Sequence, residues 1–169
     1  MADKYEKYVD LAKRYGMLDT LVISTSEIFF DIRTNLKCCW GCDRQPTAST
    51  RCDSRGTTYD ERIRMIKQYK SVLLLHSHDA KRLSEVILEL EREAFLDGYY
   101  FAFALRTCNL CGECLEAKGK ECPQPDKVRP CEALFGIDVY KTARKFGLPC
   151  EVLKTKEDTQ NRYGFLLIE

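Results

Sequence analysis

The chain has 169 residues, and its 27 basic and 26 acidic side chains give a formal net charge of +1. This balance excludes the basic surface of a typical nucleic-acid-binding protein, so we expect no nucleic-acid partner. No apolar run approaches the roughly 18 residues that a membrane helix needs. The first residues, MADKYEKYVDLAKRYG, are charged throughout and contain no apolar signal region. We therefore expect a cytoplasmic protein with no membrane partner.

Helical and strand patterns alternate along the chain. Apolar spacing predicts helices over residues 3–15, 59–69, 79–96 and 136–146. Runs rich in β-branched and aromatic residues predict strands over residues 18–30, 71–76, 99–105 and 163–168. This order favours a single α/β domain over residues 1–169, with a mixed sheet flanked by helices.

Two helix starts carry capping residues. Thr58 is followed three residues later by Glu61, which is the spacing of a capping box, and Asp79 precedes the longest helical pattern. Two cysteine-rich metal-binding loops, residues 37–57 and 107–131, are inserted after strands. Since strand ends gather at common edges of a sheet, we expect the two loops to meet.

Five of the ten cysteines lie in the second loop. A C-x2-C-x2-C run followed by a Cys-Pro pair is typical of the thiolates that hold cubane iron–sulfur clusters in bacterial ferredoxins. Seven residues separate the third cysteine from the Cys-Pro pair here, so the fourth thiolate can fold back to the same cluster. The expected ligands of this cluster are Cys108, Cys111, Cys114 and Cys122.

The first loop supplies a second set of thiols. Cys38, Cys42 and Cys52 give three ligands, with the adjacent Cys39 as the alternative to Cys38. Three ligands suggest a second cluster that is completed by Cys131, by a non-protein ligand, or left with one open iron. A zinc site or a purely structural group of thiols is the competing interpretation.

Three functions follow from these sets. The preferred one is an iron–sulfur protein with one or two 4Fe–4S clusters that exchanges electrons with a redox partner protein. The second is an enzyme that binds a small molecule at an open iron of the N-terminal cluster. The third is a zinc-stabilised interaction module.

The sequence resembles a family of predicted metal-binding proteins of unknown function found in methanogens and anaerobic bacteria. The likeness rests on Lys37-Cys38, Gly41-Cys42 and Cys52 in the first loop, and on the block KVRPCEALFGIDVYKTARKFG from Lys127 to Gly147. The resemblance implies iron–sulfur clusters but no secure activity. It also implies serine where this chain has Cys131, which favours an incompletely ligated N-terminal cluster and favours Cys38 over Cys39 as its ligand. Two prolines usually follow the third N-terminal cysteine of relatives, whereas Cys52 precedes Asp53-Ser54.

A few other residues have candidate roles. His76 and His78 end a strand on one side and are candidates for a metal ligand or proton transfer, although a simple strand exit is the commoner interpretation. Trp40 is expected to shield a cluster from water. Arg129 is expected to bind an anionic ligand or an acidic group on a neighbouring helix, and Cys150 is expected to be a core or surface thiol. Two basic residues are candidates for bonds to cluster sulfides, Arg106 and Lys127.

Overall fold

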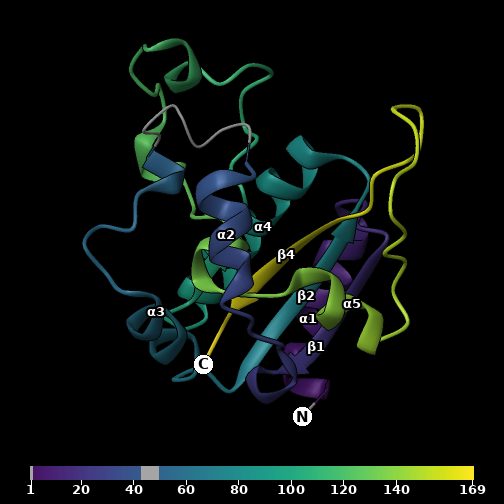
Figure 1. Cartoon of the computed structure of the whole chain (residues 1–169). Coiled ribbons are helices and arrows are strands. Elements are labelled where there is room, and N and C mark those ends of the chain that lie inside the picture. Colours follow the sequence, from purple (N-terminus) through teal and green to yellow (C-terminus); the bar gives the residue numbers. More distant parts are fainter. Residues whose placement is uncertain (1, 43–49) are drawn as a thin grey trace.

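The computed structural model describes residues 2–42 and 50–169, which form one four-stranded sheet with helices on both faces (Figure 1). The predicted α/β class is confirmed. The strands are β1 (Asp19–Ser24), β2 (Ser71–Ser77), β3 (Phe103–Leu105) and β4 (Arg162–Leu167). The α-helices of the described residues are α1 (Ala2–Arg14), α2 (Arg33–Trp40), α3 (Tyr59–Ile66), α4 (Ala80–Leu96) and α5 (Val139–Lys145). None of these helices is long and apolar enough to cross a bilayer.

The strand order is β1-β2-β4-β3, and every neighbouring pair is antiparallel. The sequence predicted mixed strand directions, and this part of the prediction needs correction. Both β2 and β3 pair antiparallel with β4, so they run in the same direction and α4 connects them as a crossover helix. A β2–α4–β3 pattern implies that β2 and β3 pair in parallel. Here β4, the last strand of the chain, lies between β2 and β3 and pairs antiparallel with each.

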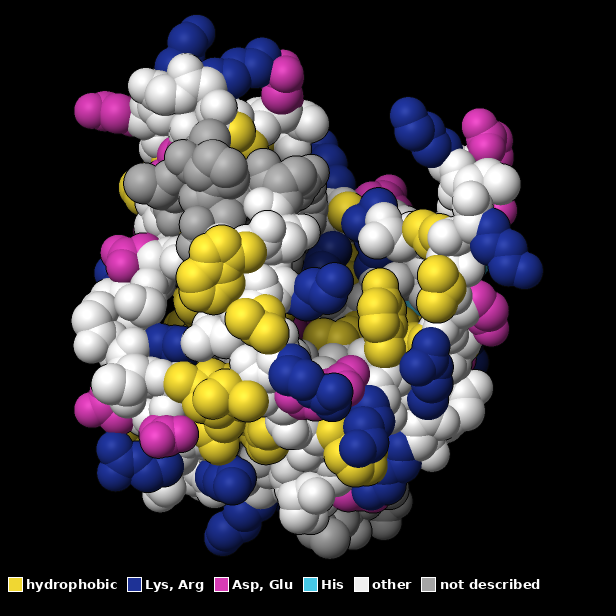
Figure 2. Space-filling model, in the orientation of Figure 1, with side chains coloured by type: hydrophobic (Ala, Val, Ile, Leu, Met, Phe, Trp, Pro, Cys, Tyr) yellow, Lys and Arg dark blue, Asp and Glu magenta, His cyan; other side chains and the backbone are white. Residues whose placement is uncertain are grey.

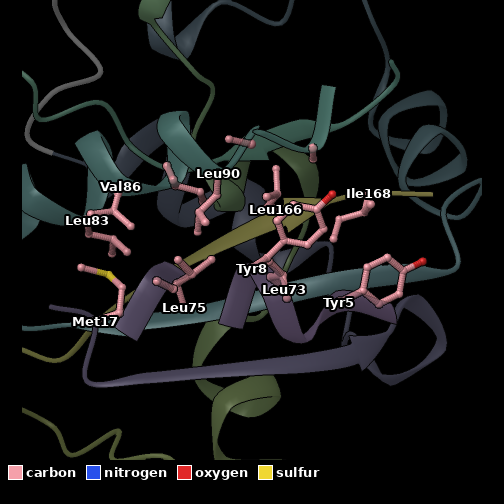
Figure 3. Close-up of a cluster of buried hydrophobic side chains, with 14 residues drawn as sticks. Tyr5, Tyr8, Met17, Leu73, Leu75, Leu83, Val86, Leu90, Leu166 and Ile168 are labelled. Atoms are coloured by element: carbon pink, nitrogen blue, oxygen red, sulfur yellow. The ribbon is translucent and has the colours of Figure 1, made fainter. Parts of the chain in front are cut away.

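The two central strands are buried on both faces. On one face, alternate residues of β2 and β4 pack against α1 and α4 (Figure 3). On the other face, the intervening residues pack against side chains from α3 and α5. A strand covered on both sides has no polar face, which explains the continuous apolar sequences of β2 and β4. The first face includes Leu73, Leu75, Leu166 and Ile168, and the second includes Val72, Leu74, Phe165 and Leu167.

Two predicted strands are shorter than expected. β1 ends at Ser24, because the Ser24 side chain and Glu27 form a capping box that starts the 3₁₀ turn η1 (Thr25–Glu27). The predicted strand at 99–105 contains only the three residues of β3. Tyr99 instead packs its ring near Tyr5 and Tyr8 of α1, and a turn joins it to Ala102.

The predicted helix caps are confirmed. Thr58 accepts a hydrogen bond from the Glu61 amide while the Glu61 carboxylate accepts from the Thr58 amide. Asp79 accepts from the amides of Lys81 and Arg82 at the start of α4. Each cap satisfies amides that the first helical turn leaves without a partner.

The loop predicted at 37–57 begins inside a helix, which corrects its boundary. The helix α2 includes Cys38 and Cys39, and residues 43–49 of the predicted loop lie outside the described residues. No residue of α2 is buried, and the helix is only eight residues long, which is shorter than the sequence window over which helical periodicity is recognised.

A short pairing fixes where α2 starts. Phe30 and Ile137 form an isolated antiparallel bridge, and the Asp31 amide donates to the Gly136 carbonyl at 2.9 Å. The Asp138 amide donates to the Phe29 carbonyl at 2.8 Å. These bonds hold the segment before α2 against the segment after the 3₁₀ turn η5 (Glu132–Phe135), and α2 packs directly on that turn.

Candidate metal centre

Four cysteines of the second loop line one cavity. The cavity has a volume of about 270 Å³, and each of the four thiols is half-buried. Leu110, Leu115 and Val128 contribute apolar walls. The sequence prediction that these cysteines belong together is therefore consistent with their placement around one space. The four are Cys108, Cys111, Cys114 and Cys122.

The second loop is attached to α4 at both of its ends. At its start, the Asn109 amide donates to the Ser84 hydroxyl at 3.2 Å. At its end, the Arg129 guanidinium donates to the Glu91 carboxylate, with Nη2 2.5 Å from Oε1 and Nε 2.9 Å from Oε2. Glu91 also accepts from the Ala104 amide of β3 at 2.6 Å. The cysteines between these two points are thus held over one end of the sheet.

The Arg129–Glu91 pair supports one of the two roles predicted for Arg129. Its partner is the acidic group on a neighbouring helix, and hydrogen bonding to Glu91 raises the pKa of the Arg129 guanidinium. Arg129 also lies around a small cavity with Arg106, Cys108 and Lys127. The charges of Arg129 and Cys108 interact across this space.

The first cysteine set is gathered at the end of α2. Cys38 and Cys39 occupy the last turn of the helix, and Cys42 follows the C-cap residue Gly41. Cys52 ends the 3₁₀ turn η2 (Thr50–Cys52). Burial, followed by the neighbouring thiols of Cys39, Cys52 and Cys42, raises the pKa of Cys38 to about 11. The charges of these three cysteines therefore act on the Cys38 thiol.

The two loops meet, although not for the reason that the sequence suggested. The Thr50 amide donates to the Glu116 carboxylate of the second loop at 3.1 Å, and the Thr50 hydroxyl donates to the same carboxylate. β1 and β3 run in opposite directions, so they end at opposite edges of the sheet. The helix α2 carries the first loop back across the sheet to the second (Figure 1).

Cys131 lies between the two sets. It precedes η5, against which α2 packs, and its pKa is affected by the charge of Cys38. Burial, together with the Glu132 carboxylate, raises the pKa of Cys131 to about 12, and a hydrogen bond with the Thr107 side chain opposes this rise. The Cys131 side chain is half-buried and lines a surface groove.

Sequence reasoning missed Arg62, which links the first loop to η5. Its side chain is 5% exposed, and its Nε donates to the Leu134 carbonyl at 2.7 Å. Its Nη1 donates to the Thr57 carbonyl at 2.5 Å, and its charge lowers the pKa of Cys38. The only signal in the sequence is that Arg62 lies four residues before Ile66, on the side of α3 that enters the core.

Trp40 does not have the buried position that a shielding role predicts. Its side chain is 81% exposed. Ile32, Leu36 and Trp40 are spaced four residues apart on α2, and all three are exposed. We call them the α2 apolar stripe; apolar side chains lie over α2 on this face of the molecule (Figure 2).

The two histidines are engaged with polar side chains. His76 is buried, with Nδ1 2.7 Å from an Asp19 oxygen and Nε2 2.9 Å from the Asn161 side-chain oxygen. His78 Nε2 lies 3.1 Å from the same Asn161 oxygen. This network ties β1, β2 and the start of β4 together. Cys150 is buried in the second core cluster, as the sequence predicted for a core thiol.

Both cysteine sets offer sulfur alone to a metal. All ten cysteines lie in the described part of the chain, and no disulfide joins them there. Within the described residues, no three His, Cys, Asp or Glu side chains already stand at the spacing that holds a metal ion. All-thiol donors gathered around one cavity fit a thiophilic metal such as iron in a sulfide cluster or zinc.

A model of one protein family matches residues 21–168, and its description is "Predicted metal-binding protein (DUF2284)". The match extends the resemblance noted from the cysteine motifs to include the final strand β4. No curated protein and no solved structure shows significant similarity to the chain. The family assignment and the ten cysteines support metal binding in general. The chain therefore belongs to the family of predicted metal-binding proteins to which the cysteine spacing pointed.

Proposed function

We propose that this protein is an iron–sulfur protein that transfers electrons to or from a partner protein. The observation that carries the proposal is the placement of Cys108, Cys111, Cys114 and Cys122 around one cavity. Their C-x2-C-x2-C spacing with a following Cys-Pro is typical of 4Fe–4S ligation. The apolar residues around the same cavity exclude water from a bound cluster, and exclusion of water tunes its potential.

A second cluster is proposed at the first cysteine set. Its ligands are Cys38, Cys42 and Cys52, with Cys131 as the fourth thiolate. Cys38 is preferred to its neighbour because the Cys39 thiol is directed along the helix, with its sulfur 3.9 Å from the Asn35 side-chain oxygen. The interaction of Cys131 with Cys38 supports ligation by Cys131 in this chain.

The chemistry of such clusters, once bound, is reversible one-electron transfer. The protein contributes the thiolates, fixes the two loops relative to each other through Thr50 and Glu116, and presents a surface to the partner. The α2 apolar stripe lies on the helix that carries Cys38, and exposed apolar residues of this kind are common in protein contacts. A partner bound there lies close to the proposed N-terminal cluster.

Metal analysis of anaerobically purified protein tests the proposal. The expected result is iron and acid-labile sulfide in equal amounts, about eight of each per chain for two cubane clusters, with a spin-resonance signal after reduction. A Cys114→Ser variant is expected to lose the C-terminal cluster while keeping the N-terminal one. Zinc without sulfide would instead establish the zinc-stabilised module and end the electron-transfer proposal.

A small-molecule enzyme at the N-terminal centre is the second candidate. The observation that favours it is a surface groove that has Cys131 in its wall. The two candidates differ in what ligates the fourth iron. If Cys131 is a ligand, Cys131→Ala changes the spin-resonance signal of the N-terminal cluster. An unchanged signal, together with a ligand that exchanges in solution, would favour the enzyme.

A further inference from the structure

A large groove opens beside Cys131, between α2 and the start of α5. Its volume is about 780 Å³, which lies within the range of small-molecule sites. In Figure 2 this region is the recess between the side chains over α2 and those over α5, where apolar and basic side chains lie together. The segment that leads into β4 closes the third side with Gln160, Asn161, Arg162 and Tyr163.

The charged groups of the groove differ in how well they are paired. Four basic and three acidic side chains line it. Asp31 already binds Arg33 at 2.5 Å, and Asp138 accepts the Lys141 amide as the cap of α5. Lys37 has no ion-pair partner among the described residues. Asp31 is therefore paired with Arg33, and one oxygen of Asp138 is occupied as a helix cap, while Lys37 is available to an anion.

Arg106 is the second incompletely satisfied cation. Its side chain is 9% exposed, and its Nη1 lies 3.6 Å from a Glu132 oxygen. Within the described residues, its Nε and the Glu132 Oε1 have no hydrogen-bond partner. Buried polar groups are normally hydrogen-bonded, and those left unpaired often mark a binding function. Arg106 contributes to the groove wall next to Cys131 and Glu132.

The remaining walls are apolar. Leu36 lies on the α2 side, Ile137 and Tyr140 lie on the α5 side, and Tyr163 lies on the β4 side. Tyr140 is about half exposed, so its ring can contact a ligand without rearrangement of the core. Apolar walls with a few polar groups are the usual composition of a site for a small organic molecule.

We propose that this groove binds a small organic carboxylate. The carboxylate is directed towards Lys37 and Arg106, and the apolar body contacts Leu36 and Tyr140. One negative charge suits the groove better than two, since the three acidic side chains nearly balance the four basic ones. This inference goes beyond electron transfer, because it depends on the groove and not on which metal the thiols hold. The bound molecule lies beside Cys131 and hence beside the proposed N-terminal centre.

Calorimetric titration of the metal-loaded protein under anaerobic conditions tests the proposal. The probe is benzoate, with benzyl alcohol as the uncharged control and inorganic phosphate as the compact anion. We expect benzoate to bind and the two controls to bind at least tenfold more weakly. Equal binding of benzyl alcohol, stronger binding of phosphate, or no binding of benzoate would each overturn the proposal.

Variants then locate the binding. Lys37→Gln is expected to weaken benzoate binding about tenfold, as the loss of one charged hydrogen bond does. Lys13→Gln on α1 makes the same charge change away from the groove and is expected to leave binding unchanged. Tyr140→Ser removes an apolar wall at a half-exposed position, so it is expected to weaken binding without unfolding the chain. If all three variants bind benzoate as tightly as the unmodified protein does, benzoate binds elsewhere and the proposed site in the groove is refuted.

The same sample separates this inference from the proposed function. Its iron, zinc and sulfide contents are measured alongside the titration. Zinc in place of iron would end the electron-transfer proposal and leave the carboxylate site standing. Iron and sulfide without benzoate binding would support the electron-transfer proposal and end the carboxylate-site proposal.

Discussion

Gly136 joins the turn that follows Cys131 to the segment before α2, and replacing it with alanine tests how tightly the two cysteine loops are held. Its φ is +77°, which is a left-handed conformation that L-residues adopt at a cost of about 1–2 kcal/mol. Alanine also reduces the conformational entropy of the unfolded chain, which stabilises the folded state by about 0.4–1 kcal/mol. From backbone strain alone, Gly136→Ala should therefore lower the free energy of unfolding by about 1 kcal/mol.

The surroundings of Gly136 add a second cost. A Cβ built there would lie 2.6 Å from Tyr59 Cε2, 2.8 Å from its hydroxyl oxygen and 2.9 Å from Cζ. Relief of this contact requires displacement of the outer end of the Tyr59 side chain, which starts α3, and overpacking of this kind costs about 1–3 kcal/mol. The total expected loss is about 2–4 kcal/mol. Because the Gly136 carbonyl accepts from the Asp31 amide, the shift should also weaken metal binding by the first cysteine set.

Gly147 supplies the matched control. Its φ is +73°, and nothing lies within 4 Å of a Cβ built on it. Gly147→Ala should therefore cost only about 1 kcal/mol. Urea unfolding of both variants, followed by fluorescence, measures the difference. Equal losses of unfolding free energy in the two variants would show that the Tyr59 side chain moves aside at little cost. The tight contact between α3 and the η5 turn would then be refuted. A Gly136→Ala/Tyr59→Leu double variant should recover part of the loss.

Three further predictions concern the metal ligands, an exposed indole and a structural ion pair. Cys111→Ser should lower bound metal by about half, whereas Cys150→Ala should keep all of it, because the Cys150 thiol is buried in the core; equal metal content in both would contradict the assignment of the second loop. Trp40→Ala should change the free energy of unfolding by less than about 0.5 kcal/mol, since the indole is exposed, and a large loss in a thermal melt would contradict that exposure. Glu91→Ala should cost about 2–3 kcal/mol, because it leaves the half-buried Arg129 without its carboxylate; a loss below about 0.5 kcal/mol in urea unfolding would show that the pair is not structural.

Local signals in the sequence predicted most of the scaffold. Thr58 and Asp79 marked two helix starts, and both caps are present. The apolar runs of β2 and β4 were recognised as strands, since strands covered on both faces show this pattern. The sequence could not reveal that β4 enters between β2 and β3. That pairing depends on contacts between strands that are more than fifty residues apart, and periodicity contains no information about them.

The helix α2 escaped prediction for a different reason. Arg33, Thr34, Asn35 and Lys37 give it a polar composition, and no residue of it is buried. Its position depends on the bridge between Phe30 and Ile137 and on the η5 turn, which lies about a hundred residues further along the chain. The sequence therefore predicts a loop around Cys38 and Cys39, and a loop prediction does not fix the relative directions of the two thiols.

The geometry of α2 gives the adjacent cysteines different surroundings. Consecutive residues on a helix point about 100° apart, so Cys38 and Cys39 cannot both face the same centre from one turn. The Cys39 sulfur lies 3.9 Å from the Asn35 side-chain oxygen one turn earlier, whereas Cys38 is affected by the charges of Cys39, Cys52 and Cys42 and itself affects Cys131. A flexible loop would have left both thiols equally available. The helix α2, which the sequence did not predict, thus distinguishes the proposed ligand Cys38 from Cys39. It also brings Cys38 close to the second loop and to the groove.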